Sequence, residues 1–426
     1  MIMFLMLVAL VAMICLNVPI AIALAISAIL GLLATEGAGS LVTVALDMYD
    51  GSTKFSLIAI PMFVLAGAIM NASGISRRLI AFVTSLLGFV RGGLSMVTIG
   101  VSLFFAEISG SAVADVAAIG SILIPEMKKR GYKKAFAAAV TSSSASLAII
   151  IPPSIPMILY AVSAGTSVEQ LFVAGVVPGL IGAAGLMGVA YYSARRYDLP
   201  IEEAFNMAQV RKTFIDALPT FALPVIILGG IFGGYVTATE AAGLAVLVSL
   251  VIGFWYREVD PGRLKTAVLE GGMQTAVVML LVAASVLMGG FLTRAQIPQE
   301  IAQSIIDFTD NKFVILAILN VFFLIIGFFL HSAAAIILVI PIVIPLIQQA
   351  GIDPIHFGLV VTLNLAIGQQ TPPVASVLIT ACSIAKANIW EVSRMNLPFV
   401  GVLLAVLVLC TYVPAVPLFL VEFFYR

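Results

Sequence analysis

The sequence predicts an all-α, polytopic membrane protein with two inverted-topology repeats, each holding a re-entrant hairpin and a helix broken at a Pro-Pro pair. Three observations lead to this fold class. First, 62% of the 426 residues are hydrophobic and only 10% are charged, which excludes an ordinary soluble domain. Second, a stretch of the first half recurs in the second half at a constant spacing. Third, the basic residues separate the loops into two sides.

Long uncharged runs supply the membrane segments. They cover residues 1–35, 55–76, 135–168, 313–352 and 354–385. A spanning helix needs roughly 20 apolar residues, so several of these runs contain a break or more than one crossing. The first run lacks a basic start and precedes further apolar segments, so we expect mature structure there rather than a cleaved signal.

The composition also limits the chemistry. A net charge of zero argues against nucleic-acid binding. Cys15, Cys382 and Cys410 lie far apart in apolar surroundings and match neither a disulfide framework nor a metal set. The two histidines, His331 and His356, form no HExxH motif, and paired membrane aspartates are missing. We therefore expect no enzyme and no cofactor.

The internal repeat has an offset of 220 residues and needs no gap between about Phe105 and Pro178. A second block, with Gly67 and Ile75, matches at an offset of 222. The matched pairs of the first block are Ile124-Pro125 with Ile344-Pro345, Gly131 with Gly351, Pro152-Pro153 with Pro372-Pro373, Ala161 with Ala381, Ser163 with Ser383 and Pro178 with Pro398.

The distribution of basic residues predicts that the two copies of the repeat cross the membrane in opposite directions. The loop near residue 130 contains Lys128, Lys129, Arg130, Lys133 and Lys134, whereas the matching loop from Leu346 to Pro354 has no basic residue. By the positive-inside rule, the first loop is cytoplasmic and the second is not. One consistent threading places all but four of the 21 lysines and arginines inside and both chain ends outside. The outside residues are Lys54, Arg294, Lys312 and Arg426.

Two segments are too short to cross the membrane twice, and they predict re-entrant hairpins. The first stretch, AEISGSAVADVAAIGSILIP, would turn at Ser109-Gly110-Ser111. Its repeat mate would enter from the other side and turn near His331-Ser332-Ala333.

The Pro-Pro pairs predict two unwound spans, from Thr141 to Ser154 and from Thr362 to Val374. Proline donates no N–H and clashes with the carbonyl one turn earlier, so carbonyl groups are left free. Backbone of this kind survives at membrane depth only inside protein or beside a polar cavity. Hairpin tips and unwound spans would therefore meet near the midplane, where helix N-termini attract an anion and bare oxygens ligate a cation such as Na⁺. Ser/Gly patches also serve as close helix–helix contacts, which is the structural alternative.

The motifs AEISGSAVADVAAIGSILIPEMKKRGY, IIPPSIPMILY and YVTATEAAG resemble the large membrane (permease) subunit of the tripartite ATP-independent periplasmic (TRAP) transporters, over essentially the whole chain. The layout also resembles the sodium/dicarboxylate symporters, an elevator-type group. The resemblance implies Na⁺-coupled uptake of a carboxylate, either sialic acid or a C4-dicarboxylate, in the bacterial inner membrane. It further implies two partners, a periplasmic substrate-binding protein and a small four-helix membrane subunit.

Candidate sodium ligands come from the tips and the spans. They are Ser109, Gly110, Asp115, Ser142, Ser332, Gly368 and Thr371. An intramembrane carboxylate is costly unless it is paired or functional, so Asp115 either orients an ion site or caps its helix. Glu107 is assigned to neither role, and His331 fits a pH sensor or a structural histidine equally.

Candidate substrate contacts are Ser111, Ser154, Asn364, Gln369 and Arg294. Arg294 would lie outside the membrane core, where a guanidinium pairs with a carboxylate in two bonds. The alternative for Arg294 is an interfacial anchor or a contact with the binding protein.

The predicted domains follow from the repeat. Residues 1–90 and 217–310 form scaffold segments, 91–190 and 311–426 form repeat segments that move as a transport domain, and 191–216 bridge them on the cytoplasmic side with an amphipathic helix. Two rival functions stay open at this point. A stand-alone Na⁺/dicarboxylate symporter would need no binding protein, and a passive channel would need no Na⁺ gradient.

Overall fold

The fold is described from a computed structural model of the chain. The structure describes residues 8–10, 12–13, 16, 18–201, 204–372 and 375–425, and it describes no side chain at 107–109 or 263. Within these ranges every regular element is helical, and the only β contact is an isolated bridge between Arg91 and Ile201. The predicted all-α class is confirmed.

The segments predicted as scaffold and bridge supply nine α-helices within the described residues. They are α2 (Ile20–Glu36), α3 (Leu41–Ser52), α4 (Ala59–Ala72), α5 (Ile75–Leu87), α12 (Met207–Ala217), α13 (Ala222–Phe232), α14 (Ala238–Trp255), α15 (Pro261–Arg294) and α16 (Ile297–Phe308). Short 3-10 turns join some of them: η1 (Ala38–Ser40), η2 (Phe55–Ile58) and η3 (Leu218–Phe221).

The predicted repeat segments supply the other helices within the described residues. The first segment holds α6 (Gly93–Ser109), α7 (Ala112–Lys129), α8 (Lys134–Ala145), α9 (Leu147–Ile150), α10 (Ile155–Ala164) and α11 (Val168–Arg196). The second holds α17 (Lys312–Phe329), α18 (Ser332–Gln349), α19 (Pro354–Gly368), α20 (Ser376–Ala385), α21 (Ile389–Tyr412) and α22 (Ala415–Tyr425).

Nine helical stretches of the described chain are long and apolar enough to cross a membrane. They are Phe55–Ala72, Lys134–Ala164, Val168–Arg196, Met207–Phe232, Ala238–Trp255, Leu264–Arg294, Lys312–Phe329, Ser332–Gln349 and Ile389–Tyr412. Other apolar helices are shorter, including Pro354–Gly368 and Ser376–Ala385. The polytopic prediction is therefore confirmed, and the direction of each crossing remains a prediction.

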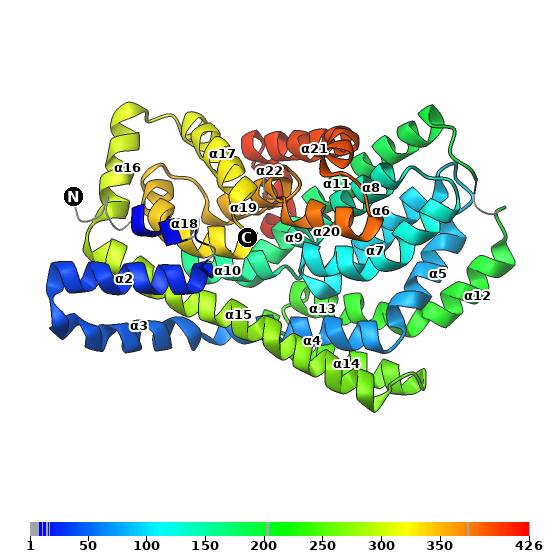
Figure 1. The fold of residues 1–426 in the computed structure, drawn as a ribbon, viewed down its shortest axis with the longest axis horizontal. Helices are drawn as coiled ribbons and strands as arrows, with labels where there is room; N and C mark the ends of the chain where they lie inside the picture. Colours follow the sequence, from blue (N-terminus) through cyan, green and yellow to red (C-terminus); the bar gives the residue numbers. More distant parts are fainter. Residues whose placement is uncertain are drawn as a thin grey trace.

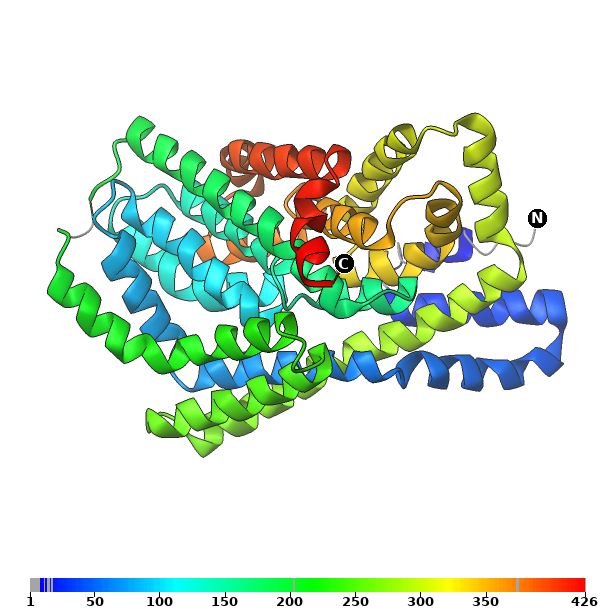
Figure 2. The ribbon, with the colours of Figure 1, turned by 180° about the vertical axis from the view of Figure 1, so that it is seen from behind.

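The helices form two layers, which Figures 1 and 2 show from opposite sides. The scaffold helices α3, α4, α14 and α15 run along the lower edge of both views, and the repeat helices lie above them. The main apolar core joins both layers, because it includes buried side chains from the scaffold and from both repeat segments. A separate small core packs α2 against α15.

Backbone carbonyls of the second half accept hydrogen bonds from two lysines in the basic loop of the first half. Lys128 Nζ donates to the carbonyl of Ala385 at 3.2 Å, and Lys134 Nζ donates to the carbonyl of Lys386 at 3.4 Å. Both acceptors lie at the C-terminal end of α20, where carbonyl groups lack helical partners and the helix dipole favours a cation. The loop that the sequence predicts to be cytoplasmic thus also caps a helix.

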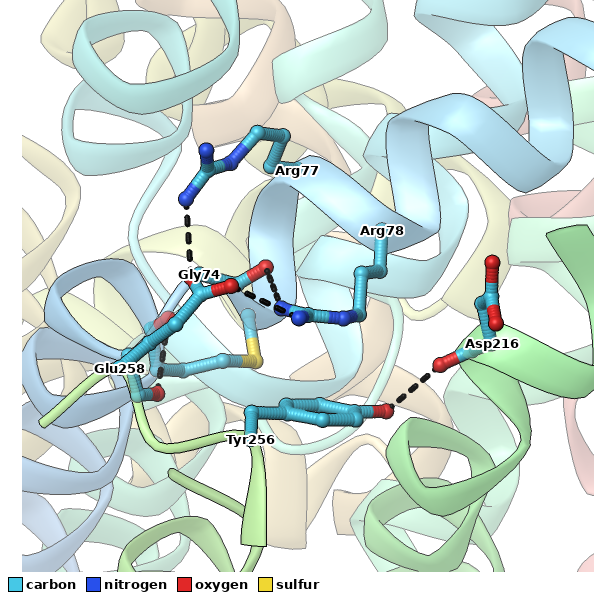
Figure 3. A network of polar contacts seen from close by, with 8 residues as sticks. Gly74, Arg77, Arg78, Asp216, Tyr256 and Glu258 are labelled. Carbon is cyan, nitrogen blue, oxygen red and sulfur yellow. Dashed lines mark hydrogen bonds and ion pairs between the residues drawn. The ribbon is translucent and has the colours of Figure 1, made fainter. Parts of the chain in front are cut away.

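An ionic cluster joins the first turn of α5 to the turn after α14 (Figure 3). Glu258 pairs with Arg77 at 2.8 Å and with Arg78 at 2.7 Å. The Arg78 guanidinium lies 3.8 Å from the centre of the Tyr256 ring, and the Tyr256 hydroxyl donates to the carbonyl of Asp216 at 2.8 Å. We call Arg77, Arg78, Tyr256 and Glu258 the Glu258 cluster.

Helix α12 begins in the segment that the sequence predicts as the bridge. α12 packs on α5, where Phe214 and Phe82 have ring centres 5.6 Å apart and the hydroxyls of Thr213 and Ser85 are 2.7 Å apart. Its other face is exposed, with Ile215 among the exposed side chains. One face against protein and one face outward is the arrangement expected of an amphipathic helix.

Candidate functional site

The first predicted turn lies between α6 and α7. Gly110 has a φ of +59°, which suits glycine because it has no Cβ atom, and Ser111 caps α7 by accepting from the backbone N–H of Ala114 at 3.5 Å. α6 and α7 pack against each other, so the chain doubles back here. Asp115 is buried in the first turn of α7. The predicted ligand Ser109 ends α6, and its side chain lies outside the described residues.

The first break is shorter than predicted. α8 and α9, separated by a turn at Ser146, extend to Ile150, and residues 151–154 then leave helical geometry. Ser142 therefore lies within α8, and its hydroxyl donates to the carbonyl of Ala139 at 3.1 Å. Serine hydroxyls can bond the carbonyl one turn earlier, so a run of serines need not unwind a helix. The prediction that Thr141 to Ser154 is unwound throughout was wrong.

Ser154 closes the first break. Its hydroxyl donates to the carbonyl of Ile149 at 2.7 Å and accepts from the backbone N–H of Met157 at 3.4 Å, so it caps α10. The hairpin turn docks on this break, because the N–H of Ile155 donates to the carbonyl of Gly110 at 3.4 Å. A Cβ atom at Gly110 would lie only 3.0 Å from the carbonyl oxygen of Pro153. The structure therefore brings the first tip and the first break together.

The second turn lies between α17 and α18. Leu330 is extended, and His331 caps α18 by accepting from the N–H of Ala333 at 3.4 Å. The predicted ligand Ser332 is the first residue of α18 and is buried. α17 packs mainly along α19, whereas α18 packs on α10, α15 and α16, so the two limbs diverge more than α6 and α7 do.

The second break follows α19 and is also shorter than predicted. Helix α19 continues to Gly368, and α20 begins at Ser376 after residues 369–375, of which Pro373 and Val374 lie outside the described residues. Asn364 is thus helical, one turn before the break, and the prediction of an unwound span from Thr362 was wrong. Thr371 follows the helix, and its hydroxyl donates to the carbonyl of Ile367 at 3.1 Å.

Two glycines allow α17 and α19 to touch at this point. A Cβ atom on Gly368 would lie 2.5 Å from Cα of Gly327. Small residues permit this close approach between membrane helices. Gly368, a predicted sodium ligand, therefore has a packing role in the structure.

Gln370 joins the two repeat segments. Its amide nitrogen donates to the carbonyl of Ser142 at 2.7 Å and to the Ser146 hydroxyl at 2.8 Å. The amide of Asn396 donates to the Gln370 oxygen at 3.4 Å, and the Ser143 hydroxyl donates to the Asn396 oxygen. All five side chains are buried. We call Ser142, Ser143, Ser146, Gln370 and Asn396 the amide network.

A second amide pair lies beside it. The Asn364 amide donates to the Asn320 oxygen at 2.7 Å, and the Asn320 amide donates to the Thr411 hydroxyl at 3.0 Å. The side-chain oxygen of Asn364 is buried and has no hydrogen-bond partner among the described residues. Gln369 is buried near this end of α19, and its oxygen accepts from Ser376 at 3.3 Å.

Sequence reasoning missed Asn320, Asn396 and Thr411. Each is a polar residue inside a helix that is a candidate membrane span, which is itself a signal, because polar groups within a membrane are costly without partners. Their partners lie dozens or hundreds of residues away, so the sequence alone did not connect them.

Arg294 lies apart from the breaks. It ends α15 and pairs with Asp47 of α3 at 2.5 Å and with the Thr43 hydroxyl at 3.3 Å. Among the described residues there is no group of three or more His, Cys, Asp or Glu side chains that could hold a metal ion. The atoms at the breaks that could ligate an ion are instead hydroxyl, amide and carbonyl oxygens. Such oxygens suit a hard monovalent cation.

Comparison with known proteins is consistent over nearly the whole chain. The family model for the DctM component of the tripartite ATP-independent periplasmic transporters matches residues 7–416. The isethionate TRAP transporter permease protein DctMQ of Oleidesulfovibrio alaskensis is 42% identical over 407 residues, or 95% of this chain. The match covers 64% of that protein, so the chain spans less than two thirds of its length.

Another relative is matched over a larger share of its own length. The C4-dicarboxylate TRAP transporter large permease protein DctM of Pseudomonas aeruginosa is 38% identical over 377 residues, covering 88% of each chain. Among solved structures, the Alcanivorax borkumensis YdaH transporter, whose topology is described as unusual, superimposes with a TM-score of 0.64. It covers 89% of both chains at 15% identity, so the similarity concerns the fold alone.

Proposed function

The chain belongs to the DctM component family of the tripartite ATP-independent periplasmic transporters, and from that premise we propose that it imports a small carboxylate coupled to Na⁺. It is a multi-pass component of a transporter rather than an enzyme. The cargo we favour is a C4-dicarboxylate, and sialic acid is the alternative. Relatives are named for C4-dicarboxylates and for isethionate, which are all small organic anions.

The proposal includes two partners and a location. A periplasmic binding protein would deliver the anion, and a small four-helix membrane subunit would pack on the scaffold segments. The complex would lie in the bacterial inner membrane, with both ends of this chain on the periplasmic side.

One observation carries the proposal. A hairpin turn docks on a helix break in the first repeat segment, and Gln370 in the second break bonds to Ser142 and Ser146, which links the two segments. Hydroxyl oxygens of Ser154 and Thr371 lie at the two breaks, and the buried carboxylate of Asp115 is close in sequence to the first turn. Such a set of oxygen atoms fits Na⁺ at half-unwound helices, as in other Na⁺-coupled transporters.

Corresponding contacts support an inverted repeat. The Ser146 hydroxyl donates at 3.4 Å to the carbonyl of Ala366, which is its own mate at the offset of 220 residues. At the same offset, the packing of α10 on α18 corresponds to the packing of α20 on α7, and both pairs are in contact. A two-fold relation places residues near its axis in contact with their mates.

Movement is the remaining part of the proposal. The two repeat segments would slide against the scaffold helices as one transport domain, carrying anion and Na⁺ together in an elevator-type mechanism. The layered arrangement, with the scaffold helices along one edge, is compatible with such a displacement (Figure 1).

Uptake into proteoliposomes tests the proposal. The vesicles would hold this chain with the small subunit and binding protein encoded beside it, and labelled succinate, sialic acid and isethionate would be offered with inward Na⁺ or with K⁺. Accumulation only with Na⁺ and the binding protein is expected. Asp115→Asn should raise the half-saturating Na⁺ concentration, whereas Ser121→Ala, an exposed position on the same helix, should not.

Other results would change the assignment. Uptake without the binding protein would indicate a stand-alone symporter. Equal uptake in K⁺ would contradict Na⁺ coupling and indicate a passive channel or another driving ion.

A further inference from the structure

A cavity of about 220 Å³ lies between the two layers. Its scaffold walls come from α3, the turn before η2 and α15, and its other walls come from the repeat helices α10 and α18. The polar residues that line it are Asp47, Lys54, Ser163 and Ser285. Since a water molecule fills about 30 Å³ in the liquid, the cavity has room for a carboxylate group with a short chain.

Lys54 supplies a positive charge to this cavity. Its ammonium donates to the carbonyl of Val162 on α10 at 3.4 Å. No carboxylate of the described residues lies within ion-pair distance of it. An ammonium group has three hydrogen-bond donors, so one contact with a carbonyl leaves capacity for an anion.

Ser285 supplies a hydroxyl that lacks a partner. Its side chain on α15 is 1% exposed and lines the cavity. Its hydroxyl oxygen has no hydrogen-bond partner among the described residues. Burying a hydroxyl in that state is unfavourable, and a polar ligand in the cavity would correct it.

Asp47 does not cancel the positive charge of Lys54. Its carboxylate is paired with Arg294 at 2.5 Å, and Arg294 also donates to Thr43. This pair leaves the wall near α3 close to neutral, so the charge that remains facing the cavity is that of Lys54. Charge in a cleft with low-dielectric walls attracts an ion of opposite sign.

The cavity and the first break lie along the same helix, α10. From Ser154 at the break to Val162 beside the cavity, α10 rises about 12 Å, at 1.5 Å per residue. The sequence predicts that Lys54 and Arg294 lie on the outer side of the membrane. An anion arriving from that side would meet the cavity before it meets the break.

We propose that this cavity is an outer access site that binds one carboxylate of the incoming anion through Lys54 and Ser285. The site rests on the proposed function for its cargo, and it adds a binding step that precedes the breaks. Val162 and Ser163 belong to a repeat segment, whereas Lys54 and Ser285 belong to the scaffold. The site therefore exists as described only when the two layers have the relative position seen here.

Cysteine labelling tests the site without transport. In a chain whose native cysteines are replaced by serine, Ser163→Cys would be reacted in nanodiscs with an anionic sulfonate or a cationic trimethylammonium methanethiosulfonate. The anionic reagent should react about tenfold faster because of the nearby ammonium, and Lys54→Gln should remove that preference. Succinate should slow the reaction at Ser163→Cys but not at the exposed control Ser304→Cys.

Uptake supplies the second measurement. Lys54→Gln should raise the half-saturating anion concentration about tenfold without changing the half-saturating Na⁺ concentration. Lys54→Arg keeps the positive charge, so its half-saturating anion concentration should stay close to that of the unchanged protein. Lys312→Gln, an exposed lysine outside this cavity, is the matched control.

Failure of the site and failure of the function give different results. Equal labelling by both reagents, or no protection by succinate, would overturn the access site even if Na⁺-coupled uptake is found. A Lys54→Gln effect on maximal rate alone would also overturn it, because it would make Lys54 a contact between layers. Protection by succinate without any uptake would retain the site and contradict the proposed function.

Discussion

The amide network and the Glu258 cluster both tie distant parts of the chain together, yet with different chemistry. The network lies between the two repeat segments and contains only hydroxyl, amide and carbonyl groups. The cluster lies at one end of the scaffold and contains two arginines, a glutamate and a tyrosine (Figure 3). A buried ion pair must recover a large desolvation cost, whereas neutral hydrogen bonds avoid most of it. Neutral groups therefore form the buried amide network, and charged groups form the Glu258 cluster, which water reaches.

The close contact of α17 with α19 beside the network gives the largest expected effect. Gly368→Val would place side-chain atoms where Gly327 backbone now lies, and we expect a loss of about 3 kcal/mol or more in the free energy of unfolding. Thermal unfolding of the purified protein in detergent would measure it. Gly401→Val is the control, because nothing lies within 4 Å of a Cβ atom there. Equal effects of the two substitutions would contradict the contact.

Removing the side-chain amide of Gln370 should have the next largest effect on the free energy of unfolding. Gln370→Leu would leave the Asn396 amide and the Ser142 carbonyl without their partner, at a cost of about 1–3 kcal/mol. The double variant with Asn396→Leu should lose less than the sum of the two single variants, since the residues share one network. Gln348→Leu, at an exposed position, is the control. Additive losses would mean that the network does not act as a unit.

The two arginines that pair with Glu258 should differ from each other. Arg78 is 25% exposed and also covers the Tyr256 ring, so Arg78→Ala should cost about 1–2 kcal/mol. Arg77 is 73% exposed, so Arg77→Ala should cost less than about 0.5 kcal/mol. Thermal unfolding of both variants at low and high salt would measure the difference. An equal cost would show that charge pairing alone, without the ring, holds the cluster.

Tyr256→Phe should have a smaller effect than Arg78→Ala. The ring under Arg78 is kept, and only the hydrogen bond to the Asp216 carbonyl is lost. We expect a cost of about 0.5–1.5 kcal/mol that does not depend on salt. A loss as large as that of Arg78→Ala would mean that the hydroxyl, rather than the guanidinium, fastens this end of the scaffold.

The sequence alone predicted the features of the fold that have a local cause. Consecutive prolines break a helix by themselves, so both breaks were predicted, and Gly110 marked the first turn. The extent of the breaks was overestimated, because the Ser142 hydroxyl bonds to the Ala139 carbonyl within an intact helix. Asn364 likewise remains helical, since its amide bonds to the Val360 carbonyl one turn earlier.

Partners separated by long stretches of chain could not be predicted. Arg294 was assigned to substrate, and the structure pairs it with Asp47, which lies 247 positions earlier. Asn396 was not selected at all, although it completes the network around Gln370. Pairing of this kind depends on how helices pack, and a single sequence holds no record of that.

The separation of Ser142 from Gln370 has a consequence for how the protein is made. The two positions are 228 residues apart, so at a synthesis rate of about 5–20 residues per second the first helix waits about 10–50 s for its partner. During that interval the Ser146 hydroxyl lacks the Gln370 amide, and the C-terminal carbonyls of α20 do not yet exist for Lys128 and Lys134 to bind. A chain whose translation stops before Gln370 would leave the Ser142 carbonyl and the Ser146 hydroxyl without this partner. Cellular proteases that survey the membrane for unpaired polar surface would therefore encounter the incomplete product and spare the finished one.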